Sequence, residues 1–334
     1  MESLCLVVPR KKAEPVRRRL IEKGVLRRNL QIKSDAKNVY LPVSQRIDLG
    51  YPVESADFRE TDEVVSDYRL LVDIPEELRS KLPASFDTIG SIAVVKMEDS
   101  VTPYAAQIGN AILATQKAIK TVCMDSGVVT EFRTRAVKIV AGDKNTETLH
   151  KEYGLTFKVD VARAFFSPRL ATERQAVAKQ VKPGDVVIDM FAGIGPFSII
   201  IARTSSPKVV YSIDLNPDAI ELLKENIALN KATTVKPILG DARKEIIDLE
   251  KADHVVMNLP HYAKDYISEA IGALKPGGII HYYEIMAEGE IRQRLDEIAD
   301  AARRDGKLMK ELGRREIKSY SPTMVFYGFD LQFT

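Results

Sequence analysis

A short apolar run passes directly into a glycine-rich turn in the second half of the chain, reading VVIDMFAGIGPFS. Val186–Met190 is apolar and largely β-branched, as buried parallel strands are, and Asp189 lies near its carboxyl end. Gly193 and Gly195 allow a sharp turn and the close approach of a ligand. The proline that follows is tolerated in the first turn of a helix. The segment therefore predicts a nucleotide-binding corner made of a strand, a turn and a helix.

The corner differs from the dinucleotide fingerprint G-x-G-x-x-G, because Ser198 occupies the third glycine position. Asp189 and Phe191 extend the turn to the pattern D-x-F-x-G-x-G. This pattern resembles motif I of class I S-adenosylmethionine methyltransferases, and it implies that cofactor.

Acidic residues follow two further apolar runs in the same way. Val209–Ile213 ends at Asp214, which is placed to accept hydrogen bonds from ribose hydroxyls, and Asp241 follows the next run, where an acid usually faces an adenine amino group. Each of these acids could instead be a helix cap or a turn residue.

Apolar runs alternate with helix-like segments throughout this region, with two more strands at 253–257 and 279–283 and a final one at 323–333 after a helix at 288–304. The alternation predicts an α/β class I (Rossmann-like) fold with a doubly wound, mostly parallel sheet.

The fourth apolar run ends in Asn258-Leu259-Pro260-His261. Methyltransferases that act on planar nitrogens carry Asn/Asp-Pro-Pro-Tyr there, so Asn258 and Pro260 are expected to grip the edge of a flat base. Proline presets the backbone carbonyl because its φ is fixed. The alternative for Asn258 is a helix N-cap, and His261 could be either a loop residue or a ligand contact.

Length, charge and cysteine content indicate the organisation. A chain of 334 residues allows two or three domains, and we expect a small basic module at 1–57, a second α/β module at 67–155 and the methyltransferase domain at 156–334, with an acidic linker at 54–67. Residues 1–33 hold ten Lys and Arg against three Glu, an excess of seven positive charges. Such a cluster is typical of a phosphate-binding face, although a solvated helix surface is the alternative.

The second module is expected to contain a helix from Pro103 to Val122 and strands at 89–97, 128–131 and 136–141. Two distant cysteines and four histidines make a metal site unexpected. No apolar stretch has the length of a membrane span, and we expect a cytoplasmic protein.

Two segments before the glycine-rich corner carry further candidates. Glu173 opens a helix, where it could favour the positive helix end or act as a general base. Arg133, in the sequence FRTR, could be a solvated strand residue or a charge partner for a ring carbonyl.

FFSPRLATER, FRTR, DMFAGIGPFSI and NLPH together resemble the archaeal and eukaryotic tRNA guanine-N1 methyltransferases that act at position 37, beside the anticodon. The resemblance covers essentially the whole chain. It implies that Glu173 is the general base, that Arg133 stabilises the base carbonyl oxygen and that Asn258 and Pro260 hold the base. Phe165 stands where many relatives carry Tyr, so stacking is retained without a hydroxyl group.

The resemblance also implies a cofactor site and a partner. The tRNA would be bound through its anticodon loop and its elbow by a monomeric enzyme without metal. The expected contacts to S-adenosylmethionine are made by Phe165, Arg174, Asp189, Phe191, Ala192, Gly193, Gly195, Asp214, Leu215, Asp241, Ala242 and Asn258.

The implied reaction is direct displacement at the sulfonium methyl group. The Asn258-Leu259-Pro260-His261 variant with Phe165 is similar to the archaeal branch in which some members also methylate carbon 7 of a tricyclic wyosine precursor. Three other functions remain open: aminocarboxypropyl transfer in wyosine synthesis, methylation of a protein or small molecule, and RNA binding without catalysis.

Overall fold

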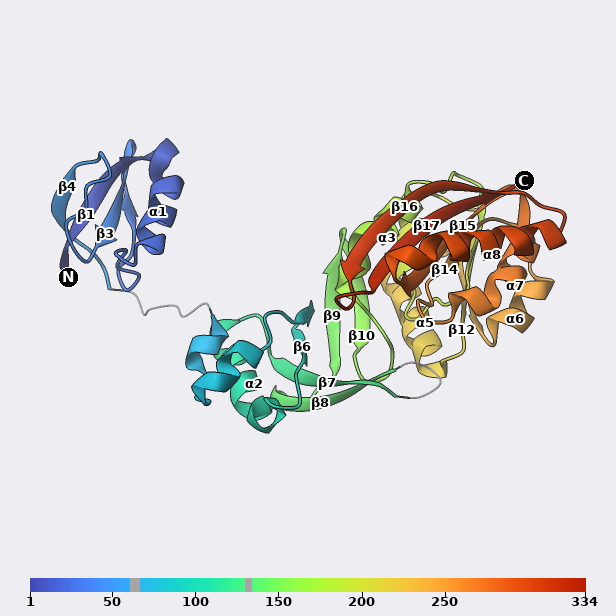
Figure 1. The fold of residues 1–334 in the computed structure, drawn as a ribbon, viewed down its shortest axis with the longest axis horizontal. Helices are drawn as coiled ribbons and strands as arrows, with labels where there is room; N and C mark the ends of the chain where they lie inside the picture. Colours follow the sequence, from blue (N-terminus) through green and yellow to red (C-terminus); the bar gives the residue numbers. More distant parts are fainter. Residues whose placement is uncertain (61–66, 130–133) are drawn as a thin grey trace. The chain divides into compact units, whose positions relative to one another are not determined.

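The computed structural model describes residues 1–60, 67–129 and 134–334 (Figure 1). The chain divides into two compact units: one contains Met1–Asp73 with Ala114–Gln116, and the other contains Ile74–Leu113 and Lys117–Thr334. Arg133 lies outside the described residues, so its role stays a prediction. No helix in the described ranges is long and apolar enough to cross a membrane.

The first unit is a four-stranded antiparallel sheet with one α-helix. Its strand order is β2 (Lys33–Ser34), β3 (Asn38–Val43), β1 (Glu2–Pro9) and β4 (Val53–Asp57). Helix α1 (Ala13–Glu22) buries Val16 and Leu20 in its core. Strand β4 occupies part of the segment expected to be a linker, so that expectation is wrong for residues 54–57. The acidic side chains of β4 are exposed, and the strand forms because its backbone pairs with β1.

The second unit begins with another small sheet, in the order β5 (Asp87–Ile89), β6 (Ile92–Lys96), β7 (Thr121–Val129) and β8 (Thr134–Gly142). Helix α2 (Ala105–Thr115) connects β6 to β7, which pair in parallel. The expectation of one helix up to Val122 is therefore wrong, because the run that begins at Thr121 is buried as a central strand.

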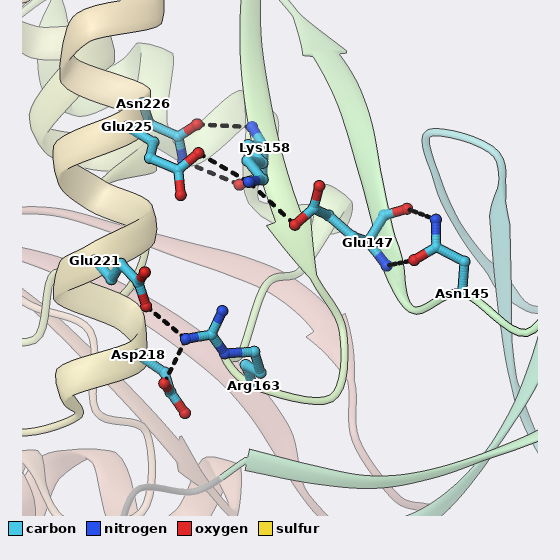
Figure 2. Close-up of polar contacts among 8 residues, drawn as sticks. All are labelled: Asn145, Glu147, Lys158, Arg163, Asp218, Glu221, Glu225 and Asn226. Atoms are coloured by element: carbon cyan, nitrogen blue, oxygen red, sulfur yellow. Dashed lines mark hydrogen bonds and ion pairs between the residues drawn. The ribbon is translucent and has the colours of Figure 1, made fainter.

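A two-stranded hairpin, β9 (Glu147–Glu152) and β10 (Leu155–Asp160), packs on helix α5 (Pro217–Asn230). Figure 2 shows the contact: the Asn226 side chain accepts from the Lys158 amide at 2.6 Å and donates to its carbonyl at 3.0 Å. Asn230 makes the same pair of bonds with Thr156. The domain boundary expected at 155/156 falls within this hairpin.

Ion pairs reinforce the hairpin contact at its exposed rim. Lys158 lies between Glu225 at 2.8 Å and Glu147 at 3.1 Å, and Arg163 reaches both Asp218 and Glu221 on α5 (Figure 2). Exposed ion pairs of this kind contribute little individually to stability. The buried asparagine hydrogen bonds therefore do most to fix the position of the hairpin on α5.

The large sheet confirms the α/β prediction. Five strands pair in parallel, and two more strands extend the sheet through antiparallel pairings. Their order is β13 (Val235–Leu239), β12 (Val209–Asp214), β11 (Val186–Asp189), β14 (Ala252–Met257), β15 (Leu274–Met286), β17 (Val325–Phe333) and β16 (Met309–Ser319).

Helices cover both faces of this sheet, as a doubly wound fold requires. Helices α3 (Ala171–Ala178), α4 (Pro196–Thr204) and α5 contribute to one apolar cluster. Helices α6 (Ala242–Glu245), α7 (Ile267–Ala273) and α8 (Ile291–Arg304) contribute to the other. The carboxyl ends of β11 to β14 therefore meet at one edge of the sheet, where ligands bind in such folds.

Candidate active site

Asp189 ends the buried strand β11 with only one of its carboxylate oxygens satisfied. Its Oδ2 accepts a hydrogen bond from the Ser198 hydroxyl at 2.7 Å, and Ser198 in turn accepts from Ser212 at 2.8 Å. Oδ1 is buried without a hydrogen-bond partner in the described structure. Burial raises the pKa of Asp189 to about 7. An unpaired buried carboxylate oxygen is costly, so this atom is suited to a ligand that carries hydrogen-bond donors.

The glycine-rich turn is fastened to the next strand by Asp214. The Gly193 amide donates to Asp214 Oδ2 at 2.6 Å, and the Asn216 amide donates to Oδ1 at 2.9 Å. Gly193 has a φ of +56° and Gly195 a φ of +85°, and a Cβ on Gly195 would lie 2.1 Å from a methyl carbon of Leu223. Glycine is therefore required at the second position both for its φ and for packing.

Apolar side chains are exposed at the ends of the neighbouring strands. Leu215 is 49% and Leu239 54% exposed. Asp241 is the N-cap of α6 and accepts from the Arg243 amide at 3.0 Å, and Ala242 is buried behind it. Asp241 thus has the helix-cap geometry that the sequence left open. Leu239 is not among the residues expected at the site from the sequence. Its exposure makes it a candidate, and that exposure cannot be read from the sequence.

Asn258 follows strand β14, the neighbour of β11 in the sheet. Its Oδ1 is buried without a hydrogen-bond partner in the described structure, as is Oδ1 of Asp189. The Pro260 carbonyl accepts from the Ile285 amide at 3.0 Å, which fixes the loop to β15. His261 is exposed, with its ring 5.7 Å from that of Tyr320 in an edge-to-face arrangement.

Glu173 lies in the first turn of α3 and is only 7% exposed. Its Oε2 accepts from Arg315 Nε at 2.9 Å and from the Tyr283 hydroxyl at 3.3 Å. Burial without such partners would cost a carboxylate several kcal/mol, on the order of the penalty for any buried unpaired charge. The contacts come from strands β16 and β15, so Glu173 faces the large sheet and not bulk solvent.

The residues around Glu173 in sequence have different surroundings. The Phe165 ring is 44% exposed and lies 5.1 Å from the guanidinium of Arg135. Arg174 is fully buried, paired with Glu152 at 2.6 Å and donating to the Ser167 carbonyl at 2.7 Å. These contacts favour a structural role for Arg174 over the expected cofactor contact.

The remaining members of the glycine-rich corner hold it against the sheet. Phe191 packs edge-on against Tyr266 at 5.0 Å, and the Ala192 amide donates to the Ile213 carbonyl at 2.8 Å. Within the described ranges, no group of three or more His, Cys, Asp or Glu is placed to hold a metal ion.

Known proteins resemble both the domain that contains this site and the modules before it. Residues 148–307 match the family described as the TRM5/TYW2 methyltransferase domain, 68–146 the TYW2 N-terminal domain, and 5–49 the tRNA methyltransferase 5 N-terminal domain. The tRNA (guanine(37)-N(1))-methyltransferase Trm5b of Pyrococcus abyssi is 42% identical over 99% of both chains. The chain belongs to the TRM5/TYW2 methyltransferase family.

Solved structures of TRM5/TYW2 members agree with the fold. A complex of aTrm5 and tRNALeu has a TM-score of 0.74 at 33% identity and covers 98% of this chain and 99% of that one. Methanocaldococcus jannaschii TYW2 in complex with AdoMet has a TM-score of 0.58 at 33% identity and covers 75% of this chain and 99% of that one. The family and the fold expected from sequence are thereby confirmed.

Proposed function

We propose that this TRM5/TYW2 member is an S-adenosylmethionine-dependent tRNA methyltransferase that modifies N1 of the guanine at position 37. The observation that carries the proposal is the pair of buried, unpartnered oxygens on Asp189 and Asn258, at the ends of adjacent strands. Both are acceptors, and both ligands of the reaction offer donors: the ammonium group of the cofactor and the N–H edge of guanine.

The residues at the sheet edge fit the cofactor. Asp189 Oδ1 would accept from its ammonium group, and Asp214, already joined to the glycine turn, retains lone pairs for the ribose hydroxyls. The exposed side chains of Leu215 and Leu239 offer apolar contact to the adenine. When bound, S-adenosylmethionine supplies an electrophilic methyl group on a sulfonium.

Guanine N1 carries a proton and is a poor nucleophile until that proton is removed. Glu173 would accept it, and the charge that builds on the ring carbonyl oxygen would be met by Arg133, which stays a prediction. Asn258 and the rigid Pro260 backbone would hold the base edge so that N1 is aligned for attack. The base must leave its stack in the anticodon loop, which costs about a few kcal/mol, as base flipping generally does.

The basic first unit fits the tRNA backbone away from the anticodon. Lys11, Lys12 and Arg19 are exposed on and beside α1. We propose that they contact the tRNA elbow, that the enzyme works as a monomer and that it acts in the cytoplasm. The TRM5 relative solved with tRNALeu supports a tRNA substrate.

Mass spectrometry of unmodified tRNA after incubation with enzyme and cofactor tests the proposal. A gain of one methyl group on the guanine at position 37, reduced about 100-fold or more in rate by Glu173→Gln, is expected. Gain of an aminocarboxypropyl group would assign the alternative transferase activity. No gain on any nucleotide would refute the proposal.

Exposure of the Phe165 ring favours a second acceptor at the same site. A flat aromatic ring without a hydroxyl group can stack on guanine or on the tricyclic wyosine precursor. Carbon 7 of the precursor needs no N1 deprotonation, so Glu173→Gln should slow its methylation less than that of guanine. Precursor-bearing tRNA that gains no mass while guanine is fully converted would exclude this activity.

A further inference from the structure

Arg315 links Glu173, the proposed general base, to a second buried carboxylate, that of Asp330. Its Nε donates to Glu173 Oε2 at 2.9 Å, while Nη1 and Nη2 donate to the two oxygens of Asp330 at 2.6 and 3.1 Å. One guanidinium therefore spans α3, β16 and β17. The fork geometry of arginine makes such a two-oxygen pair directional as well as strong.

Asp330 is itself held by further donors. The Gln180 side-chain amide donates to Oδ2 at 2.9 Å, and His281 Nδ1 lies 2.7 Å from Oδ1. Behind it, His281 Nε2 lies 3.1 Å from His254 Nδ1. Although burial opposes its ionisation, the hydrogen bonds from His281 and Arg315 hold the pKa of Asp330 well below its usual range. Asp330 is thus an ionised, fixed anchor for Arg315.

Strand β17, which lies between β15 and β16, leaves space for the Glu173 side chain at a glycine. Gly328 on β17 pairs with Tyr283 on one side and with Arg315 on the other. A Cβ at Gly328 would lie 3.2 Å from Glu173 Oε2 and 2.9 Å from the Tyr283 ring. The missing side chain leaves the space in which the carboxylate meets its two donors.

We propose that Arg315, anchored by Asp330, is the positioning residue that orients Glu173 for removal of the guanine N1 proton. The inference rests on the proposed function, because it assigns a support to the base of that reaction. Arg315 touches no reacting atom and acts only through Glu173.

The hydrogen bonds give the two carboxylate oxygens of Glu173 different roles. Both donors reach Oε2, so Oε1 is the oxygen that takes the proton as the N1–H bond breaks and its electron pair remains on N1. The Glu173 carboxylate becomes a carboxylic acid and returns the proton to solvent after methyl transfer.

Glu173 accepts from two groups on neighbouring strands, Tyr283 on β15 and Arg315 on β16, and Asp330 on β17 holds Arg315 from behind. Burial and the charges of Glu173 and Asp330 raise the pKa of Tyr283 well above its usual value, so it stays a neutral donor. Arg315 donates to the Glu173 carboxylate directly, at 2.9 Å, so its removal should leave that carboxylate without its charged donor and without the contact that fixes its orientation.

The test is single-turnover methyl transfer at saturating S-adenosylmethionine over a range of tRNA concentrations. Arg315→Gln should lower the saturating rate by about 10-fold or more, whereas the tRNA concentration that gives half of that rate should change little. Arg315→Lys, which keeps a charged donor, should restore most of the saturating rate. Cofactor affinity, measured by calorimetry, should change less than about 3-fold, because the hydrogen bonds of Arg315 within the described residues go to Glu173 and Asp330 and not to the glycine-rich turn.

Two controls separate positioning from folding. Arg314→Gln removes an exposed cation from the same strand, paired with Glu311, and should leave the saturating rate unchanged. In a Glu173→Gln background, Arg315→Gln should have little further effect, since residues acting as one unit are not additive.

The outcomes distinguish the two proposals. A normal rate for Glu173→Gln would overturn Glu173 as the base. A large defect for Glu173→Gln together with a near-normal saturating rate for Arg315→Gln, or equal loss from Arg315→Lys and Arg315→Gln, would overturn Arg315 as its positioning residue.

Discussion

Asp189 should make cofactor binding depend on pH, and Asp189→Asn should remove that dependence. Burial raises the pKa of this carboxyl group to about 7, so it is largely protonated in the empty enzyme at mildly acidic pH. A cofactor ammonium group requires the ionised form as its acceptor. Binding should therefore strengthen as the pH rises toward 7, and it should release a proton below that value.

The magnitude follows from the ionised fraction. With a pKa of about 7, this fraction is roughly 3% at pH 5.5 and about one half at pH 7, a ratio near 16 that corresponds to about 1.6 kcal/mol. The cofactor amino group stays protonated across this window, because α-amino groups titrate at about pH 7.7 or above. The apparent dissociation constant of the wild type should fall about 16-fold between these two pH values.

Calorimetric titration of S-adenosylmethionine at several pH values, in two buffers of different ionisation enthalpy, measures affinity and proton release together. Asp189→Asn keeps an acceptor for Ser198 and should give weaker binding that varies little with pH. Wild-type affinity that is constant within about 2-fold from pH 5.5 to 7, with no proton released, would refute the role of Asp189 as the ammonium acceptor.

Three other predictions concern separate parts of the chain. Asp214→Ala should weaken S-adenosylmethionine binding by about 1–3 kcal/mol by calorimetry, because it strands two backbone amides of the turn; unaltered affinity would contradict its assignment. Asn226→Ala should lower the free energy of unfolding by roughly 3 kcal/mol in urea titrations, whereas Glu225→Gln at the exposed rim should cost less than about 1 kcal/mol. Lys11→Ala with Lys12→Ala should weaken binding of full-length tRNA and reduce the salt slope by about one for each phosphate that is no longer neutralised, but should spare an isolated anticodon stem-loop; equal weakening on both RNAs would argue against binding at the elbow.

Local sequence signals were sufficient for the strand, turn and helix at Asp189. Each of its determinants lies within a few residues of the next: the β-branched strand, the glycines and the proline that begins α4. The same is true of Asp214 at the end of β12. Where both the backbone conformation and the side-chain chemistry are local, pattern and structure agree.

Residues whose surroundings come from distant segments were not predictable in this way. Strand β16 reads MKELGRREIKS, and its half-buried residues include Glu311 and Arg315, so the apolar alternation typical of strands is absent. Arg315 meets Glu173 across 142 positions of sequence, and only the assembled sheet brings them together. The resemblance implies a cofactor contact for Arg174, yet its side chain is buried in the interior and paired with Glu152, a partner 22 positions away in the sequence.

The asparagines of α5 fix the register in which the hairpin packs on the helix. Asn226 and Asn230 are four residues apart on a helix, and the residues they bind, Lys158 and Thr156, are two apart on a strand. These separations are both about 6–7 Å, from a helical rise of about 1.5 Å and a strand rise of about 3.3 Å per residue. Each side-chain amide offers the donor and acceptor that a neighbouring strand would offer, so the helix imitates a strand along β10. The free edge is thereby closed to other chains, and a slip of one residue would break all four bonds at once.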